Sequence, residues 1–151
     1  MTRSRIKQLR LVVEADDYDE ALAFYRDVLG MSEIAAFAEG GDDRVAILDA
    51  GRATLEIASP AHKRLIDAVE TDGLVGAPVR VAFEVDDVVA VTDAAASTGA
   101  ELLAAPVETP WRSSNSRLRA PAALEITFFQ ELEAPDERAA RPGFGTDGDR
   151  P

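Results

Sequence analysis

Two arginines are the residues whose type and spacing point most directly to chemistry. Arg10 and Arg80 occupy the same place in two related stretches, 9–30 and 79–99, which begin LRLVVEADD and VRVAFEVDD. A guanidinium stays protonated, has no lone pair to donate and presents a rigid fork of N–H donors. The two arginines are therefore suited to hold an anionic or polyoxygenated ligand, and poorly suited to hold a metal ion.

Other reactive groups are scarce. The chain has no cysteine, which excludes disulfides, thiolate metal sites and a cysteine nucleophile. Its only histidine, His62, falls in a connecting segment, where we expect an exposed helical position. The acidic pairs at 16–17 and 86–87 are explained by helix capping. The sequence contains no glycine-rich phosphate loop, nucleophile elbow or Ser-His-Asp set.

The charge of the chain limits its partners. The 151 residues include 28 Asp and Glu against 16 Lys and Arg, a net charge of −12, which argues against nucleic-acid binding. No apolar run approaches the roughly 18 residues of a membrane span. The basic segment 1–10 lacks the apolar core of a signal peptide. We therefore expect a cytoplasmic protein without a nucleic-acid or membrane partner.

The first arginine belongs to a predicted module that covers residues 8–58. Apolar residues alternate over 8–14, which predicts a strand. Asp17 with Glu20 predicts a helix start, apolar residues follow at three- and four-residue steps, and Gly30 predicts its end. Further strands are expected at 31–38, 45–49 and 54–58, so that the order is βαβββ.

The second arginine belongs to a module that repeats this order over residues 79–132. A connector, 59–78, should contain a helix whose apolar face is Leu65, Ile66 and Val69. Module two is predicted from a strand at 79–84, a helix at 87–99, and strands at 101–105, 115–119 and 124–129. A loop over 106–114 carries Trp111. Residues 1–132 should form one domain, and the polar, Pro- and Gly-rich segment 133–151 should be disordered.

Three motifs resemble the vicinal oxygen chelate superfamily of glyoxalases, extradiol dioxygenases, fosfomycin-modifying enzymes and bleomycin-binding resistance proteins. They are the first-helix signature Asp16-Asp17, Asp19, Ala21, Phe24-Tyr25 and Leu29-Gly30, the FEVDD stretch at 83–87, and the AP-x-x-LEIT-x-F-Q run at 120–130. The resemblance implies an α+β fold in which two βαβββ modules form a curled mixed sheet around a cleft. It also implies a homodimer, since many members build their sites between two chains.

The resemblance also locates the positions that hold metal ligands in the metalloenzymes of the superfamily. These positions carry Arg10, Arg80, Glu56 and Thr127 here, with Glu125 as the alternative to Thr127. Arginines repel a divalent cation, so we expect neither a metal nor another cofactor. The arginines either bind a ligand or neutralise Glu56 and Glu125 across the sheet, and the sequence leaves both alternatives open.

The resulting hypothesis is a non-catalytic protein that binds a bulky, partly aromatic natural product and sequesters it, as the bleomycin-binding members do. Aromatic side chains commonly line such cavities. The predicted ligand-binding residues are Arg10, Phe37, Glu56, Arg80, Trp111, Glu125, Thr127 and Phe129. The alternatives are a glyoxalase-like lyase, isomerase or dioxygenase-type enzyme with an atypical or absent metal site, and an accessory protein with a vestigial cavity.

Overall fold

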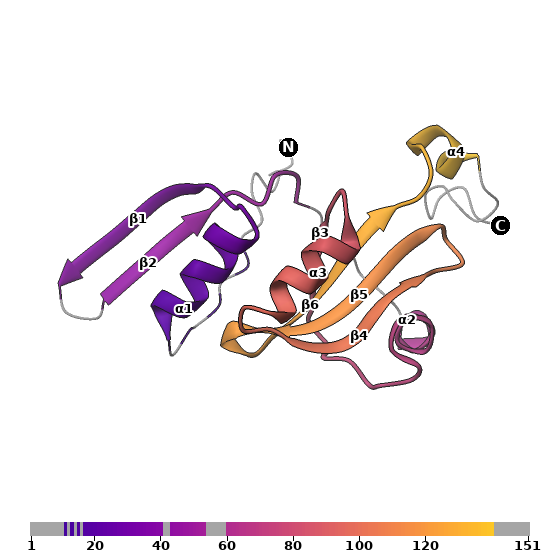
Figure 1. The fold of residues 1–151 in the computed structure, drawn as a ribbon, viewed down its shortest axis with the longest axis horizontal. Helices are drawn as coiled ribbons and strands as arrows, with labels where there is room; N and C mark the ends of the chain where they lie inside the picture. Colours follow the sequence, from indigo (N-terminus) through magenta and orange to yellow (C-terminus); the bar gives the residue numbers. More distant parts are fainter. Residues whose placement is uncertain are drawn as a thin grey trace, which may run out of the picture.

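The protein is an α+β chain with a helix-and-hairpin first part and a four-stranded second part (Figure 1). The computed structural model describes residues 17–40, 43–53 and 60–140, with the single positions 11, 13 and 15. The elements of these residues are α1 (Tyr18–Leu22), η1 (Ala23–Val28), β1 (Glu33–Gly40), β2 (Asp43–Leu48), α2 (Pro60–Thr71), β3 (Val81–Glu84), α3 (Val88–Ala96), β4 (Glu101–Glu108), β5 (Ser113–Ala120), η2 (Pro121–Ala123), β6 (Leu124–Glu131) and α4 (Pro135–Ala139).

The first helix begins and ends where the sequence predicts, but it changes type partway. The side chain of Asp17 accepts a hydrogen bond from the Glu20 backbone N–H at 3.0 Å, and Gly30 takes a left-handed φ of 70°. Beyond α1, η1 is a π-helix rather than an α-helix, closed by a bond from Leu29 N–H to Phe24 C=O. The predicted amphipathic helix is therefore present, and its division into two helical types was not predicted because residue spacing cannot distinguish these closely related helical periods.

Beyond its helix, module one is described for two of its predicted strands, β1 and β2. Strands β1 and β2 form an antiparallel hairpin that extends away from the four-stranded sheet (Figure 1). They lie within about two residues of the predicted strands. The two outer strands predicted for this module, 8–14 and 54–58, lie outside the described residues apart from isolated positions.

Module two has the predicted βαβββ order. Its strands lie in the order β3-β6-β5-β4, with β3 parallel to β6 and the other pairs antiparallel. Helix α3 is capped by Asp87, and Gly99 follows it with a φ of 115°. The predicted loop 106–114 was too long, because β4 continues to Glu108 and β5 begins at Ser113. Cross-strand pairing thus extends through a segment whose composition resembles that of a loop.

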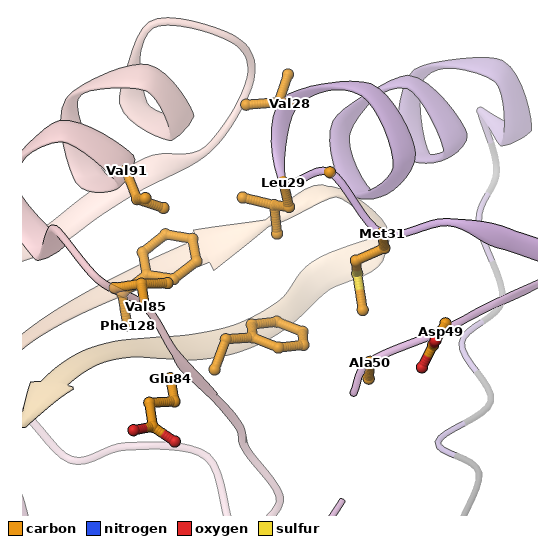
Figure 2. A pocket seen from close by; sticks show the side chains of 11 residues that line it. Val28, Leu29, Met31, Asp49, Ala50, Glu84, Val85, Val91 and Phe128 are labelled. Carbon is orange, nitrogen blue, oxygen red and sulfur yellow. The ribbon is translucent and has the colours of Figure 1, made fainter. Parts of the chain in front are cut away.

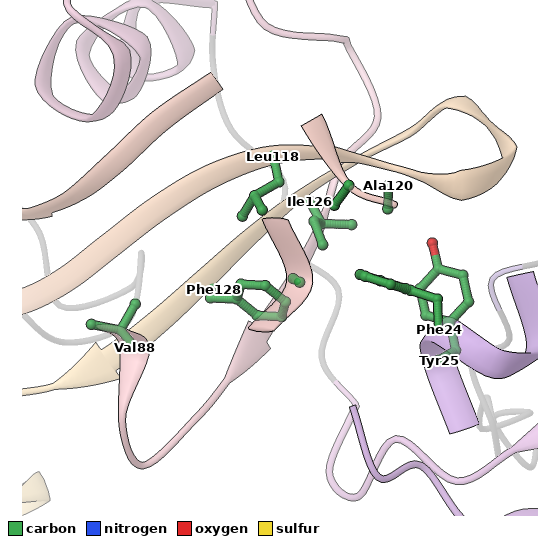
Figure 3. Close-up of a cluster of buried hydrophobic side chains, with 9 residues drawn as sticks. Phe24, Tyr25, Val88, Leu118, Ala120, Ile126 and Phe128 are labelled. Atoms are coloured by element: carbon green, nitrogen blue, oxygen red, sulfur yellow. The ribbon is translucent and has the colours of Figure 1, made fainter. Parts of the chain in front are cut away.

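The four-stranded sheet has one apolar face, which carries the core (Figure 3). Leu118, Ile126 and Phe128 project from β5 and β6 and are fully buried. They share the core cluster with Phe24 and Tyr25 of η1, which therefore joins the first helix to module two. Burial raises the pKa of Tyr25 to about 12.

The N-cap of α3 makes a defined contribution to stability. Replacing Asp87 by alanine is expected to lower the free energy of unfolding by about 1 kcal/mol. The reason is that the backbone N–H of Ala90 loses the carboxylate that accepts its hydrogen bond at 3.0 Å. The neighbouring Asp86→Ala change is the matched control, since Asp86 is exposed and lies outside the helix. Urea unfolding of both variants measures the difference, and equal losses would contradict the capping role.

The end of the described chain corrects one prediction. Residues 133–151 were predicted to be disordered. Pro135–Ala139 instead form the short helix α4, and residues 141–151 lie outside the described residues. Proline at the first helical position and two acidic residues in the first turn favour this start. Arg138 also forms an ion pair with Glu131 of β6 at 2.7 Å. Among the described residues, no helix has the length and apolar character needed to cross a membrane.

Candidate functional site

The second face of the four-stranded sheet is polar, and it brings several predicted site residues together. In the β5–β6 register, Arg117 lies opposite Thr127 and Asn115 opposite Phe129. Alternate residues of a strand share a face, so Glu125 lies on the same side. Arg80, just before β3, donates a hydrogen bond to Thr127 Oγ1. We call this surface the polar face, with the members Arg80, Ser113, Asn115, Arg117, Glu125, Thr127 and Phe129.

Arg117 is the centre of the polar face. Its side chain is fully buried, and three carboxylates surround it. Nη1 lies 3.1 Å from Asp67 Oδ1 and 3.0 Å from Glu125 Oε1, while Nη2 lies 2.6 Å from Glu70 Oε2. Asp67 and Glu70 both come from α2, which packs against β4 and β5. The connector helix therefore covers the polar face with two of its acidic residues.

Glu70 has the fullest set of partners. Its Oε1 accepts a hydrogen bond from Asn115 Nδ2 at 2.6 Å. Its Oε2 accepts from Arg117 Nη2 at 2.6 Å and from Thr127 Oγ1 at 3.4 Å. All three donors belong to adjacent strands of the sheet. A carboxylate from one element is thus held by donors that another element positions.

The segment after α2 adds backbone hydrogen bonds to the carboxylates that surround Arg117. Asp67 Oδ2 accepts from Lys63 Nζ at 2.9 Å and from the Gly76 N–H at 3.1 Å. Glu125 Oε2 accepts from the Ala77 N–H at 3.0 Å. Arg117 and Lys63 thereby oppose three carboxylates, and backbone donors supply further stabilisation.

The ionisation of the network follows from these contacts. Burial alone would raise the pKa of Asp67, but hydrogen bonds from Lys63, Gly76 and Arg117 outweigh it and hold that pKa below its ordinary value. Burial alone would lower the pKa of Arg117, but the carboxylates, Glu70 first, raise it. The guanidinium and the Asp67 carboxylate are therefore both charged at neutral pH.

A pH dependence follows for Asp67. Because its pKa is depressed in the folded protein, its contribution to stability is complete above the unfolded value of about 3.9 and is lost as the pH falls through the folded value. We expect Asp67→Asn to make the acid-induced loss of stability shallower. Urea unfolding between roughly pH 6 and pH 2.5 measures it. Asp93→Asn, at an exposed position of α3, is the control, and identical slopes for both variants would contradict the prediction.

The polar face was only partly anticipated from the sequence. Arg80, Thr127 and Glu125 do lie close together, but Glu125 pairs with Arg117, which was not among the predicted site residues. The connector helix was predicted to have the apolar face Leu65, Ile66 and Val69. Ile66 and Val69 are half-buried and Leu65 is 51% exposed, whereas Asp67 and Glu70 are buried. One signal was present, since Ser113, Asn115, Arg117 and Arg119 alternate with other residues at the strand period.

The remaining predicted residues are more scattered. Trp111 is partly buried in the turn between β4 and β5, at the end of the sheet remote from Glu125. Phe129 is partly buried on the polar face. Arg10, Glu56 and the side chain of Phe37 lie outside the described residues.

The described half of the inherited metal site does not fit a metal ion. The family resemblance assigns its two positions to Arg80 and to either Thr127 or Glu125, and a guanidinium cannot donate electrons to a cation. The nearest carboxylates, Glu70 and Glu125, are bound to Arg117. Within the part of the chain that the structure describes, no three His, Asp or Glu residues are grouped to hold a metal. We therefore derive no chemical step through a metal.

A pocket of about 230 Å³ lies where the first helix and the β2 end meet module two (Figure 2). Polar and apolar atoms contribute about equally to its lining. It is distinct from the polar face because Phe83 and Phe128 reach it from the opposite side of the sheet. Ligand sites usually measure about 300–1,000 Å³, so this pocket admits a small group rather than a bulky molecule. Its lining residues are Val28, Leu29, Gly30, Met31, Asp49, Ala50, Phe83, Glu84, Val85, Val91 and Phe128.

The fold and site define an α+β protein built on a βαβββ unit whose sheet has one apolar and one polar face. The family model described as the glyoxalase/bleomycin resistance protein/dioxygenase superfamily matches residues 6–128. The chain therefore belongs to this superfamily, which confirms the predicted family and fold class. No curated protein matches the chain.

Solved structures agree on the fold. A glyoxalase family protein from Bacillus cereus is 17% identical with a TM-score of 0.56, covering 88% of this chain and 99% of its own. A glyoxalase/bleomycin resistance protein/dioxygenase family enzyme from Burkholderia phytofirmans is 22% identical with a TM-score of 0.51, covering 77% and 91%. A glyoxalase/bleomycin resistance protein/dioxygenase from Nocardioides is 19% identical with a TM-score of 0.50, covering 96% and 93%. At these identities the likeness concerns the fold alone.

Proposed function

We propose that the protein binds a small organic molecule without transforming it, and that it protects by sequestering an antibiotic or a related natural product. The observation that carries the proposal is the pairing of Arg80 with Thr127. The family resemblance assigns these residues to positions of metal ligands in the metalloenzymes of the superfamily, and here they form a hydrogen-bonded pair. A site of this kind can recognise oxygen-rich groups of a ligand, while its guanidinium cannot donate an electron pair to a metal and repels a cation.

The aromatic residues support a ligand with an aromatic part. Phe129 lies on the polar face opposite Asn115 and retains some exposure. Trp111 is the only tryptophan of the chain, so its fluorescence reports on binding at this end of the molecule. Helix α2 covers Arg117, Asn115 and Thr127 in the described conformation, so a ligand reaches them only when α2 moves.

The test is a titration of the purified protein with bulky, partly aromatic natural-product antibiotics, bleomycin among them, followed by Trp111 fluorescence. We expect a saturable change, and a dissociation constant about tenfold higher for Arg80→Met, the loss of about 1.4 kcal/mol. Arg52→Met, at an exposed position in the turn after β2, is the matched control. Stoichiometric metal in the purified protein, with turnover that a chelator abolishes, would instead establish an enzyme.

The proposed functional unit is a homodimer. Gel filtration should then give an apparent mass near twice the 16.2 kDa of one chain. Elution at the mass of one chain would refute the dimer while leaving the ligand titration to be judged separately.

A further inference from the structure

We propose that the polar face contains a carboxylate-binding site, which α2 fills with Glu70, and that an aromatic carboxylic acid competes with Glu70 for it. The inference rests on the proposed function and adds the chemical class of the ligand. In the described conformation the Glu70 side chain would occupy the place that the carboxylate of a ligand takes.

The side chains that bind the Glu70 carboxylate belong to the sheet and not to α2. Asn115 and Arg117 lie on β5 and Thr127 on β6, within one antiparallel register, so strand pairing fixes their relative positions. Each oxygen of Glu70 receives at least one hydrogen bond from them, and Arg117 adds a full charge. A planar carboxylate is the group that such a set of donors recognises best. The donors would keep this arrangement for a carboxylate supplied by another molecule.

Arg117 has one N–H group available to donate a hydrogen bond to such a ligand. Its Nε is buried and donates to no atom of the described residues. Glu70 takes only Nη2 of the guanidinium, while Nη1 is engaged by Asp67 and Glu125. A carboxylate that approached the guanidinium edge through both Nη2 and Nε would form the two-bond geometry that Glu70 does not achieve. A buried donor without an acceptor is costly, so this second bond favours the incoming ligand.

The neighbouring aromatic residue defines the rest of the ligand. Phe129 lies directly opposite Asn115 on the same face, a separation of about 5 Å between neighbouring strands. If a carboxylate bound to these donors in place of Glu70 carried an aromatic ring, that ring would therefore contact the ring of Phe129. This combination specifies an arylcarboxylate in preference to a short aliphatic acid.

Helix α2 is held in a way that allows such exchange. Its buried residues Asp67 and Glu70 bind Arg117 of the sheet through their carboxylates, whereas the apolar Ile66 and Val69 are only half-buried and Leu65 is exposed. The segment that follows α2 leaves Val75 85% exposed. Displacement by a ligand therefore replaces one buried carboxylate by another, and the released Glu70 regains its hydration.

The first arm of the test removes the internal carboxylate. Glu70→Ala leaves the donors without their acceptor, and sodium acetate should then raise the melting temperature saturably, by roughly 3–6 °C at tenfold its dissociation constant. Equal concentrations of sodium chloride control for ionic strength. Glu101→Ala is the matched control, because it removes a carboxylate from Arg119 at the exposed edge of the sheet, and acetate should not stabilise it. If Glu70→Ala is unfolded, the same titration is read as recovery of helical circular dichroism.

The second arm uses the unaltered protein. Benzoate should displace α2 and accelerate tryptic cleavage after Lys63 and Arg64 several-fold, while neutral benzamide should not. Failure of acetate to stabilise or refold Glu70→Ala overturns the carboxylate site. Stabilisation of the variant without any benzoate effect on the unaltered protein overturns the competition, since Glu70 is then purely structural. Neither arm depends on the antibiotic titration, so a negative titration would refute the proposed function without refuting the carboxylate site.

Discussion

Replacement of Arg117 by methionine is expected to lower the free energy of unfolding by about 3–5 kcal/mol. Methionine fills a similar volume, so the loss arises chiefly from charge. Asp67, Glu70 and Glu125 converge on the guanidinium in a buried region, and without it they repel one another. Each must then become protonated, rehydrate by opening α2, or remain buried without compensation.

The control for this experiment is Arg119→Met, two residues along the same strand. Arg119 pairs with Glu101 at 2.6 Å, but both side chains are largely exposed, so the expected loss is about 1 kcal/mol or less. Urea unfolding followed by circular dichroism measures both variants. The Arg117 variant should also regain stability as the pH is lowered, because its carboxylates take up protons. A loss no larger than that of Arg119→Met would refute the central role of Arg117.

Replacement of Gly76 by alanine is expected to cost about 1–3 kcal/mol. Gly76 does not need a left-handed backbone; its requirement is space. A Cβ at this position would lie 2.8 Å from Arg117 Nη1, 2.8 Å from Glu125 Oε1 and 2.9 Å from Asp67 Oδ1. One methyl group therefore forces apart the three side chains whose contacts hold α2 on the sheet.

A double-mutant cycle separates this clash from a general backbone effect. The cost of Gly76→Ala should be smaller in the Arg117→Met background, because one of the three crowded atoms is then absent. Additive losses in the unfolding free energy would show that the methyl group does not act through Arg117. Gly51→Ala serves as a second comparison, since a Cβ there meets no atom within 4 Å and strains only the backbone φ of 72°.

The residues of the polar face differ from a metal-binding set, although the chain has the fold of the superfamily. At positions that the resemblance assigns to metal ligands, Arg80 donates a hydrogen bond to Thr127, and the buried Arg117 stands at the centre of the same face. Proteins with the same fold can have unrelated functional sites, so membership of the superfamily does not itself define the activity. The recognition of oxygen-rich groups that we propose would depend on the hydrogen-bond donors and the charge of the polar face.

Local sequence patterns determined much of module two. The capping residue Asp87, the glycine at position 99 and the alternation of apolar residues predicted the order βαβββ, because each of these signals acts over a few residues. Glu125, Thr127 and Phe129 were all predicted as site residues, and in the structure they alternate along β6 and so share one face. Segment ends were less accurate, since pairing with a neighbouring strand carried β4 through to Glu108.

Only the tertiary structure decided what the polar face contains. Arg117 and its α2 partners are separated by 50 residues for Asp67 and 47 for Glu70, and no local pattern encodes such a pairing. In a sequence, charged residues on a helix indicate an exposed face, which is what the pattern of α2 predicts. Burial becomes favourable only when the sheet supplies the guanidinium and hydrogen-bond donors that offset desolvation. The sequence determined the strands and helices of this module, whereas their packing turned the connector helix into the cover of its polar face.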